Sequence, residues 1–297
     1  MKPSGSSEGR GIFLLRRLRE VRSWKASFTS RSTRRSDAGY PGSYVVQRYI
    51  SNPRLVGGKK FDMRVYVLVT AFRPLTVYLY RNGFAKFSRA RFRMDDASLG
   101  DEVVHLTNQA VQRRSHEAVE GPSAARHKMN MRSLKMFVAA KHGRKAMDRL
   151  FWEMQMIVLR TLRSVDRLVI SDRQSFELFG FDIMVDDYLK PWLLEVNASP
   201  SLGASSPEDR WLKGRMVQDM LDVIDVEGRL STRPPPDESG LPGPGGRVVR
   251  EQVGGFDLVY HGGYVEAPPS ECGDSSLLGA VHRRRRWARA AASSASG

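Results

Sequence analysis

The stretch GFDIMVDDYLKPWLLEVNASP, residues 180–200, decides the fold. On either side of a polar segment at residues 187–190, apolar side chains alternate with others, and a period of two is typical of β-strands. The pattern predicts two antiparallel strands, residues 181–186 and 191–197, joined by that segment as a loop. One face of this hairpin is entirely apolar and consists of Phe181, Ile183, Val185, Trp192, Leu194 and Val196. We therefore expect a buried face within an antiparallel sheet.

The other face of the hairpin carries a candidate metal site. Pairing Asp186 with Pro191 places Asp182 opposite Glu195, and Asn197 joins Glu195 because residues two apart share a face. Two carboxylates and an amide on one face are costly unless a cation offsets the repulsion, and three oxygen ligands suit Mg²⁺ that bridges phosphates. A polar side that faces solvent fits the geometry equally well. The Asn-Ala-Ser-Pro corner directly after the strand favours a site.

A second candidate cluster lies in GGKKFDMRVY, residues 57–66. In a strand, Lys60, Asp62 and Arg64 share one face, and the residues between them share the other. Alternating cation, acid and cation can bind the phosphate and ribose of a nucleotide, with Arg64 offering a bidentate fork. An exposed strand that forms its own salt bridges explains the same pattern.

A further hairpin is predicted at Asn82-Gly83. Residues 65–69 and 76–80 are mostly β-branched and aromatic, which favours strands, and Asn-Gly is a strong signal for a two-residue turn. Pairing Arg81 with Phe84 puts the arginine at the end of a hairpin, where it can hold a substrate carboxylate or phosphate. An arginine at a strand end is also an ordinary surface residue.

The remaining pattern predicts an α+β domain. Apolar residues at helical spacing indicate one or two helices between residues 133 and 165 and another over residues 207–226. Residues 24–42 are rich in Ser and Arg without periodicity and are interpreted as a loop. A Gly/Pro/Arg-rich stretch begins near three prolines at 234–236, so folded structure is expected to end near residue 230 and residues 231–297 to be a largely disordered tail. Strands joined mostly by hairpins and flanked by helices favour a largely antiparallel sheet.

The composition narrows the function classes. No segment approaches the roughly 18 apolar residues that a membrane span needs. The single cysteine, Cys272, excludes an intramolecular disulfide and a multi-cysteine zinc site. The net charge of +16 over 297 residues attracts polyanions, which include nucleic acid, an anionic membrane surface and an acidic protein surface. The interleaved aromatic and basic residues typical of nucleic-acid binding are not found on any one predicted strand face.

Taken in order, these segments resemble the tubulin tyrosine ligase-like family, whose catalytic core is an ATP-grasp fold. The matching stretches are residues 2–15, 44–66, 80–92, 104–112 and 176–202, and residues 253–258 are similar to the ciliary polyglutamylase branch. Family members carry a further N-terminal domain, whereas this sequence starts at the glycine-rich loop. The resemblance therefore implies that residues 1–230 are the central and C-terminal parts of an ATP-grasp ligase core, with the N-terminal domain missing.

The resemblance implies a role for each matching residue. The ATP phosphates would be covered by Lys2, Glu8, Gly9, Arg10 and Gly11, with Glu8 standing where the family usually has glutamine. Adenine would be held by Gln47, Arg48, Tyr49 and Ile50, and the rest of the nucleotide by Lys60, Phe61 and Asp62. The catalytic residues would be Arg64 and Arg81, and the incoming amino acid would face Arg81, Thr107, Asn108 and Lys128. Mg²⁺ would be held by Asp182, Glu195 and Asn197.

The activity implied is ATP-dependent addition of free L-glutamate to glutamate side chains of tubulin tails through an acyl phosphate. The basic charge would steer the acidic tubulin tails to the enzyme. A tubulin glycine or tyrosine ligase with the same chemistry is an alternative, as is a truncated non-catalytic microtubule-binding subunit. The resemblance also implies the cytoplasm and cytoskeleton, specifically a ciliary or flagellar axoneme or basal body, with accessory subunits as further partners.

Overall fold

The computed structural model describes residues 1–4, 9–32, 43–114, 128–170, 175–225, 241–242, 248–266 and 287–289. The chain divides into two compact units. The first consists of Met1–Asp62, Lys86–Lys128 and Val185–Tyr188, and the second of Met63–Ala85, Met129–Met184 and Leu189–Gly297. Each unit is described by itself below.

Most strands of a ten-stranded sheet lie in the second unit, whereas β3 lies in the first. Along its main path the strands are β14 (Trp287–Arg289), β13 (Tyr264–Glu266), β12 (Phe256–His261), β5 (Leu75–Phe87), β4 (Lys59–Phe72), β7 (Glu177–Val185) and β8 (Pro191–Asn197). Off this path, β11 (Gln252–Val253) pairs with β12, β3 (Leu55–Val56) with β4, and β6 (Lys128–Asn130) with β5. Every strand pair with a defined register in the described residues is antiparallel, which confirms the predicted sheet type.

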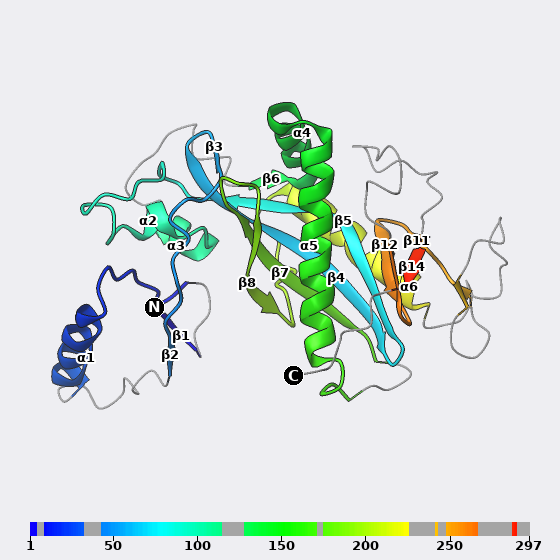
Figure 1. Ribbon diagram of the computed structural model, residues 1–297, viewed down its shortest axis with the longest axis horizontal. Coiled ribbons are helices and arrows are strands. Elements are labelled where there is room, and N and C mark those ends of the chain that lie inside the picture. The colour runs from blue at the N-terminus through cyan, green and yellow to red at the C-terminus, as the bar shows by residue number, and fades with distance from the viewer. Residues whose placement is uncertain are drawn as a thin grey trace. The chain divides into compact units, whose positions relative to one another are not determined.

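Helices cover both faces of this sheet. In Figure 1, α5 (Arg144–Val165) crosses one face and α6 (Pro207–Ile224) lies on the other. The α6 face buries Tyr66, Leu68, Tyr78, Tyr80, Phe84, Phe256 and Leu258 of the sheet against Leu212 and Met216 of the helix. The alternate residues Val67 and Val69 of β4 are also fully buried, as expected for a central strand that is covered on both sides.

The helices of the second unit begin and end at recognisable signals. The Asn130 side chain accepts a hydrogen bond from the Ser133 amide and so caps α4 (Met131–His142), while Gly143, at φ 84°, separates α4 from α5. Ser206 caps α6 in the same way through the Asp209 amide. These helices confirm the two predicted helical regions. No helix in the described part of the chain combines the length and the apolarity that a membrane crossing requires.

The first unit contains shorter elements. They are β1 (Lys2–Pro3), which pairs with β2 (Tyr44–Val45), and the helices α1 (Arg19–Ser32), α2 (Glu102–His105) and α3 (Gln109–Arg114). The prediction of a loop from residue 24 to 42 is wrong over residues 24–32, which belong to α1. This segment contains neither Gly nor Pro, and Trp24 packs edge-on against Tyr44 with ring centroids 4.7 Å apart, a contact that no local pattern reveals.

The turn predicted at Asn82-Gly83 is also wrong. Both residues lie inside β5, which runs without a break from Leu75 to Phe87. Gly83 is needed for a different reason: a Cβ at this position would lie 2.3 Å from the carbonyl oxygen of Arg64, so only glycine lets the two backbones approach. Arg81 therefore lies within a strand and not at a hairpin end.

Folded structure does not end near residue 230. Strands β11, β12 and β13 lie between Gln252 and Glu266, and β12 pairs with β5, placing Phe256 beside Tyr80 and Leu258 beside Tyr78. A short pair, β9 (Leu241–Pro242) with β10 (Val248–Val249), precedes them. The apolar residues of β12 pair with a strand about 180 positions earlier in the chain. The Gly/Pro-rich composition around β12 therefore did not predict that this segment is folded.

Candidate functional site

Lys60 is the centre of a buried polar cluster in the first unit. Its Nζ donates hydrogen bonds to the Tyr49 hydroxyl at 3.1 Å and to the His105 carbonyl at 2.7 Å, and it lies 4.7 Å from the centroid of the Tyr49 ring. Burial lowers the pKa of Lys60 to about 8, opposed by the charge of Asp62. Burial also raises the pKa of Tyr49, which keeps its hydroxyl protonated. The cluster therefore holds one cation at a position fixed by neutral oxygens.

His105 orients this cluster. Its Nδ1 lies 2.9 Å from the Tyr49 hydroxyl, and burial, followed by the nearby charge of Lys60, lowers its pKa. Its Nε2 has no hydrogen-bond partner among the described residues. The same histidine lines a cavity of about 390 Å³ together with Phe13 and Leu106. The contact with Tyr49 gives this histidine a structural role in the cluster.

Asp62 is buried with only half of its carboxylate satisfied. Lys86 pairs with its Oδ2 at 2.7 Å, while its Oδ1 has no hydrogen-bond partner among the described residues. A buried carboxylate oxygen without a partner is costly, which makes it a good acceptor for a ligand hydroxyl. Phe61 points elsewhere: its ring is 2% exposed and packs 5.5 Å from that of Phe87. It supports the strand from within the core.

The glycine-rich loop reaches Asn108. Gly9 has φ 77°, and a Cβ on it would lie 2.8 Å from Asn108 Nδ2, so this backbone passes directly over the asparagine.

The other residues predicted to bind nucleotide or substrate in the first unit differ in exposure. Thr107 is buried, Asn108 and Ile50 are half-buried, and Gln47 and Arg48 are exposed after β2. Lys2 pairs with Val45, Gly11 has φ 73°, and Arg10 is exposed, whereas Glu8 lies outside the described residues.

In the second unit, Arg64 and Asp182 form a bidentate ion pair. The two residues are direct partners in the register of β4 and β7. Arg64 Nε lies 2.5 Å from Asp182 Oδ1, and its Nη2 lies 3.0 Å from Oδ2. The Asp182 side chain is only 5% exposed, so the pair is held in a largely dry position.

The Asn197 side chain links the end of β8 to β7 by a hydrogen bond. Its Nδ2 donates to the Gly180 carbonyl at 3.2 Å and lies 3.4 Å from Glu195 Oε1. A Cβ at Gly180 would lie 2.8 Å from the Pro200 side chain and 3.0 Å from Arg64, so the corner after β8 packs where only glycine fits. The link between positions 180 and 197 agrees with the predicted hairpin pairing.

The apolar face of this hairpin is less buried than predicted. Phe181, Ile183 and Val185 are at most 1% exposed, but Trp192 and Val196 are 37% and 39% exposed. The reason is the position of β8 at the end of the main path of the sheet, where α5 contacts it but covers it only in part.

The oxygen-bearing side chains of this hairpin fit a magnesium ion chemically. Asp182, Glu195 and Asn197 stand on neighbouring strands, and a carboxylate paired with an arginine keeps further lone pairs for a metal. No group of three His, Cys, Asp or Glu side chains that could hold a metal is found within the described residues. The predicted set has only two such residues, because its third member is an amide.

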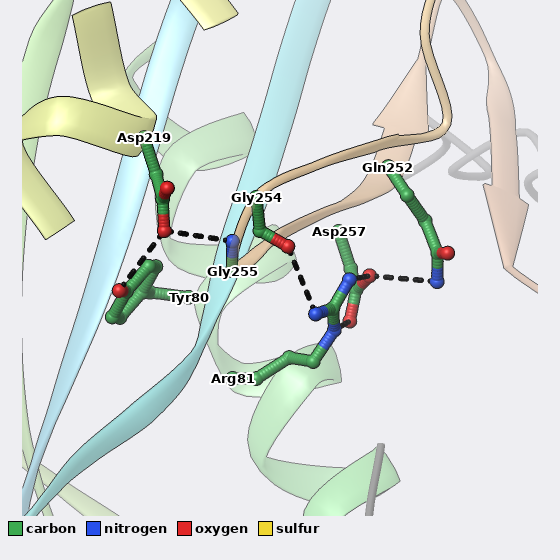
Figure 2. Close-up of polar contacts among 7 residues, drawn as sticks. All are labelled: Tyr80, Arg81, Asp219, Gln252, Gly254, Gly255 and Asp257. Atoms are coloured by element: carbon green, nitrogen blue, oxygen red, sulfur yellow. Dashed lines mark hydrogen bonds and ion pairs between the residues drawn. The ribbon is translucent and has the colours of Figure 1, made fainter. Parts of the chain in front are cut away.

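Arg81 is held by the segment that follows β11 (Figure 2). Its Nε and Nη2 each donate to a different oxygen of Asp257 at 2.8 Å, and its Nη1 donates to the Gly254 carbonyl at 2.9 Å. Lys135 of α4 adds a nearby cation: burial lowers its pKa, opposed by the charge of Asp257, and its Nζ lies 4.6 Å from the Phe151 ring centroid. Lys128, in β6, is half-buried.

Sequence reasoning missed three charged residues at these sites: Lys86, Lys135 and Asp257. Asp257 had the clearest signal, because it lies inside the 253–258 segment that carries part of the family resemblance. Lys86 and Lys135 stand in ordinary strand and helix patterns, and nothing in their surroundings marks them.

Comparison with known proteins places these observations in a family. The model of the tubulin-tyrosine ligase family matches residues 1–236. "Probable tubulin polyglutamylase TTLL9" of Rattus norvegicus is 39% identical over 97% of this chain, and "Probable tubulin polyglutamylase ttll-9" of Caenorhabditis elegans is 43% identical over 87%. "Probable alpha-tubulin polyglutamylase Ttll1" of Tetrahymena thermophila is 35% identical over 88%. The matches cover 65%, 55% and 60% of these relatives, respectively.

Proposed function

Because the chain belongs to the tubulin-tyrosine ligase family, we propose that it is an ATP-dependent ligase that adds glutamate to glutamate side chains of tubulin tails. The observation that carries this proposal is the bidentate Arg64–Asp182 pair. It joins a residue that the family resemblance assigns to phosphate with one that it assigns to magnesium. The polyglutamylase names of the relatives favour glutamate over glycine or tyrosine as the donor.

The reaction proceeds in two steps. The acceptor carboxylate attacks the γ-phosphorus of ATP, which forms an acyl phosphate and releases ADP. The amine of free glutamate then attacks the acyl carbon, and the new amide bond forms as phosphate leaves and the amine loses its protons. Mg²⁺, when bound, would neutralise phosphate charge. Little covalent work is left for the protein, so its side chains act by position and charge.

Each cluster has a task in this scheme. Lys60 contributes a fixed positive charge to nucleotide phosphate, and the unpaired oxygen of Asp62 accepts a hydrogen bond from a nucleotide hydroxyl. Arg64 offers positive charge to the phosphate in transfer while it fixes the carboxylate of Asp182. Asp182, Glu195 and Asn197 would hold Mg²⁺. Arg81 binds the carboxylate of the incoming amino acid.

Charge brings the substrate to the enzyme. The net charge of +16 attracts the acidic tails of tubulin, and this attraction weakens as salt screens it. The resemblance to the ciliary branch supports a place for the enzyme at the cytoskeleton, and we propose the axoneme or basal body of a cilium or flagellum. The C-terminal strands belong to the ligase core under this proposal, because they hold Arg81.

The test is ATP-dependent incorporation of labelled glutamate, glycine or tyrosine into microtubules. We expect glutamate to be incorporated and Glu195→Gln to reduce the rate at least about 100-fold. The control is Glu153→Gln, which neutralises a glutamate paired with Arg149 on the outer side of α5 and should leave the rate unchanged. A folded chain that binds microtubules but incorporates none of the three amino acids would overturn the proposal, and incorporation of glycine or tyrosine alone would replace the donor.

A further inference from the structure

The turn between β11 and β12 packs at one defined position against α6 and β5 of the second unit. Gly254 has φ 54°, and a Cβ on it would lie 2.2 Å from Asp219 Oδ1, while a Cβ on Gly255 would lie 2.4 Å from the Tyr80 ring. The Gly255 amide donates to Asp219 Oδ2 at 2.8 Å, and the Tyr80 hydroxyl donates to the same oxygen at 3.1 Å. Asp219, buried on α6, therefore anchors the turn between the helix and β5, as Figure 2 shows.

This anchored turn surrounds the Arg81 guanidinium. Besides the Asp257 and Gly254 contacts, Gln252 Nε2 donates to Asp257 Oδ1 at 3.0 Å and so fixes the carboxylate from its other side. An arginine has five N–H donors, and the contacts with Asp257 and Gly254 use three of them. Among the described residues these contacts leave one N–H on each terminal nitrogen, which is the number that a bidentate bond to a second carboxylate needs.

The ion pair is not required to join the strands. The backbone of Arg81 already donates to the Gly255 carbonyl at 2.9 Å, and the register of β12 against β5 is set by pairs such as Phe256 with Tyr80, whose rings are 4.7 Å apart. What the Asp257 carboxylate adds is a defined orientation for a long side chain that is 27% exposed. A side chain held in advance loses less conformational entropy when a ligand binds.

We propose that Asp257 is a positioning residue that holds Arg81 ready for the carboxylate of the incoming amino acid. This inference rests on the proposed function for the identity of that amino acid. It assigns a role in donor binding to a strand more than 170 residues after Arg81, in a stretch whose composition predicts a disordered tail. Asp257 acts through Arg81 and does not itself contact the donor.

The experiment compares Asp257→Asn and Asp257→Glu with the unchanged chain. Asparagine keeps the shape but loses the charge, while glutamate keeps the charge and displaces it. The first readout is the KM for free glutamate against the KM for ATP and the kcat. The second is the NMR signal of Arg81 Nε–H during titration with glutamate in the presence of Mg²⁺ and a non-hydrolysable ATP analogue, which requires no turnover. Glu153→Gln, from the Arg149 pair, is the matched control.

We expect Asp257→Asn to raise the KM for glutamate about tenfold with little change in kcat or in the KM for ATP. The Kd for glutamate, measured from the NMR signal of Arg81, should rise by the same factor. Asp257→Glu should recover part of the loss. Should Asp257→Asn fail to fold, Asp257→Glu decides the matter, because a displaced carboxylate must still change glutamate affinity.

The remaining outcomes separate the two proposals. Glutamate binding that is unchanged in the folded variants, or an Arg81 signal that glutamate does not perturb in the original chain, overturns the role of Asp257. A loss of affinity for every substrate in step with a fall in thermal stability also overturns it, since a merely structural residue behaves so. Absence of turnover in all variants, combined with glutamate binding that weakens in Asp257→Asn, refutes the ligase activity but supports the positioning role.

Discussion

Replacing Gly83 by alanine should force two central strands apart. The new Cβ would lie 2.3 Å from the carbonyl oxygen of Arg64 and 3.2 Å from the Met131 side chain. Because a carbon and a carbonyl oxygen rarely approach closer than about 3.3 Å, the backbones must separate by about 1 Å. Overpacking costs about 1–3 kcal/mol, and a clash with backbone belongs at the upper end. At about 2–4 °C per kcal/mol for a protein of this size, Tm should fall by about 6–12 °C.

The matched control is Asn82→Thr. If Asn82-Gly83 formed a tight turn, threonine at position 82 would be forced into a positive φ and would destabilise the protein. Inside β5, however, Asn82 does not have a positive φ, and threonine favours a strand. We expect Tm to stay the same or rise in this variant, as measured by circular dichroism during heating. A Gly83→Ala protein whose Tm lies within about 1 °C of that of the original would refute the close approach of the backbones. An Asn82→Thr protein whose Tm falls as far as that expected for Gly83→Ala would refute the placement of Asn82 in a strand.

Three further perturbations follow from the buried charges. Arg64→Met removes the arginine charge that faces the buried carboxylate of Asp182 and should lower the free energy of unfolding by about 3 kcal/mol in a urea titration, whereas loss of less than about 0.5 kcal/mol would contradict the pairing. The pKa of Lys60 falls to about 8 on folding, so between about pH 8 and its unfolded pKa near 10.5 the unfolded state binds more protons. Stability should therefore rise with pH across this window, and Lys60→Met should remove the rise. Asp219→Ala deprives Gly255 of its amide acceptor and should cost about 2 kcal/mol in the same titration, with Asp219→Asn intermediate.

Local patterns predicted the elements well where the signal was strong. The hairpin predicted from residues 181–197 corresponds to β7 and β8, and the helical spacing over residues 133–165 corresponds to α4 and α5. Errors arose where a local signal has two physical causes. Asn-Gly is typical of a tight turn, but a glycine is equally required where backbones approach, and only the neighbouring strand distinguishes the two.

The sequence proposes residues for the candidate site but does not reveal the contacts that they make. The sequence singles out Asp182, Glu195 and Asn197 from strand alternation, and the bond between Asn197 and Gly180 agrees with that pairing. It groups Lys60, Asp62 and Arg64 on one strand face, yet the structure gives each a different partner: the His105 carbonyl, Lys86 and Asp182. Those partners lie on other segments, so no spacing along the chain encodes them.

The amino-acid sequence by itself determined the family, through motifs in order along the chain. It also determined the α+β class, the antiparallel hairpin and the helical segments, because each of these depends on residue types within about 20 positions of one another. The tertiary structure alone decided that residues 252–266 complete the sheet and that Asp257 meets Arg81, 176 positions away. The physical reason is that a strand's own sequence specifies which of its faces is apolar, whereas its neighbour is chosen by the packing of the whole sheet against α5 and α6 (Figure 1).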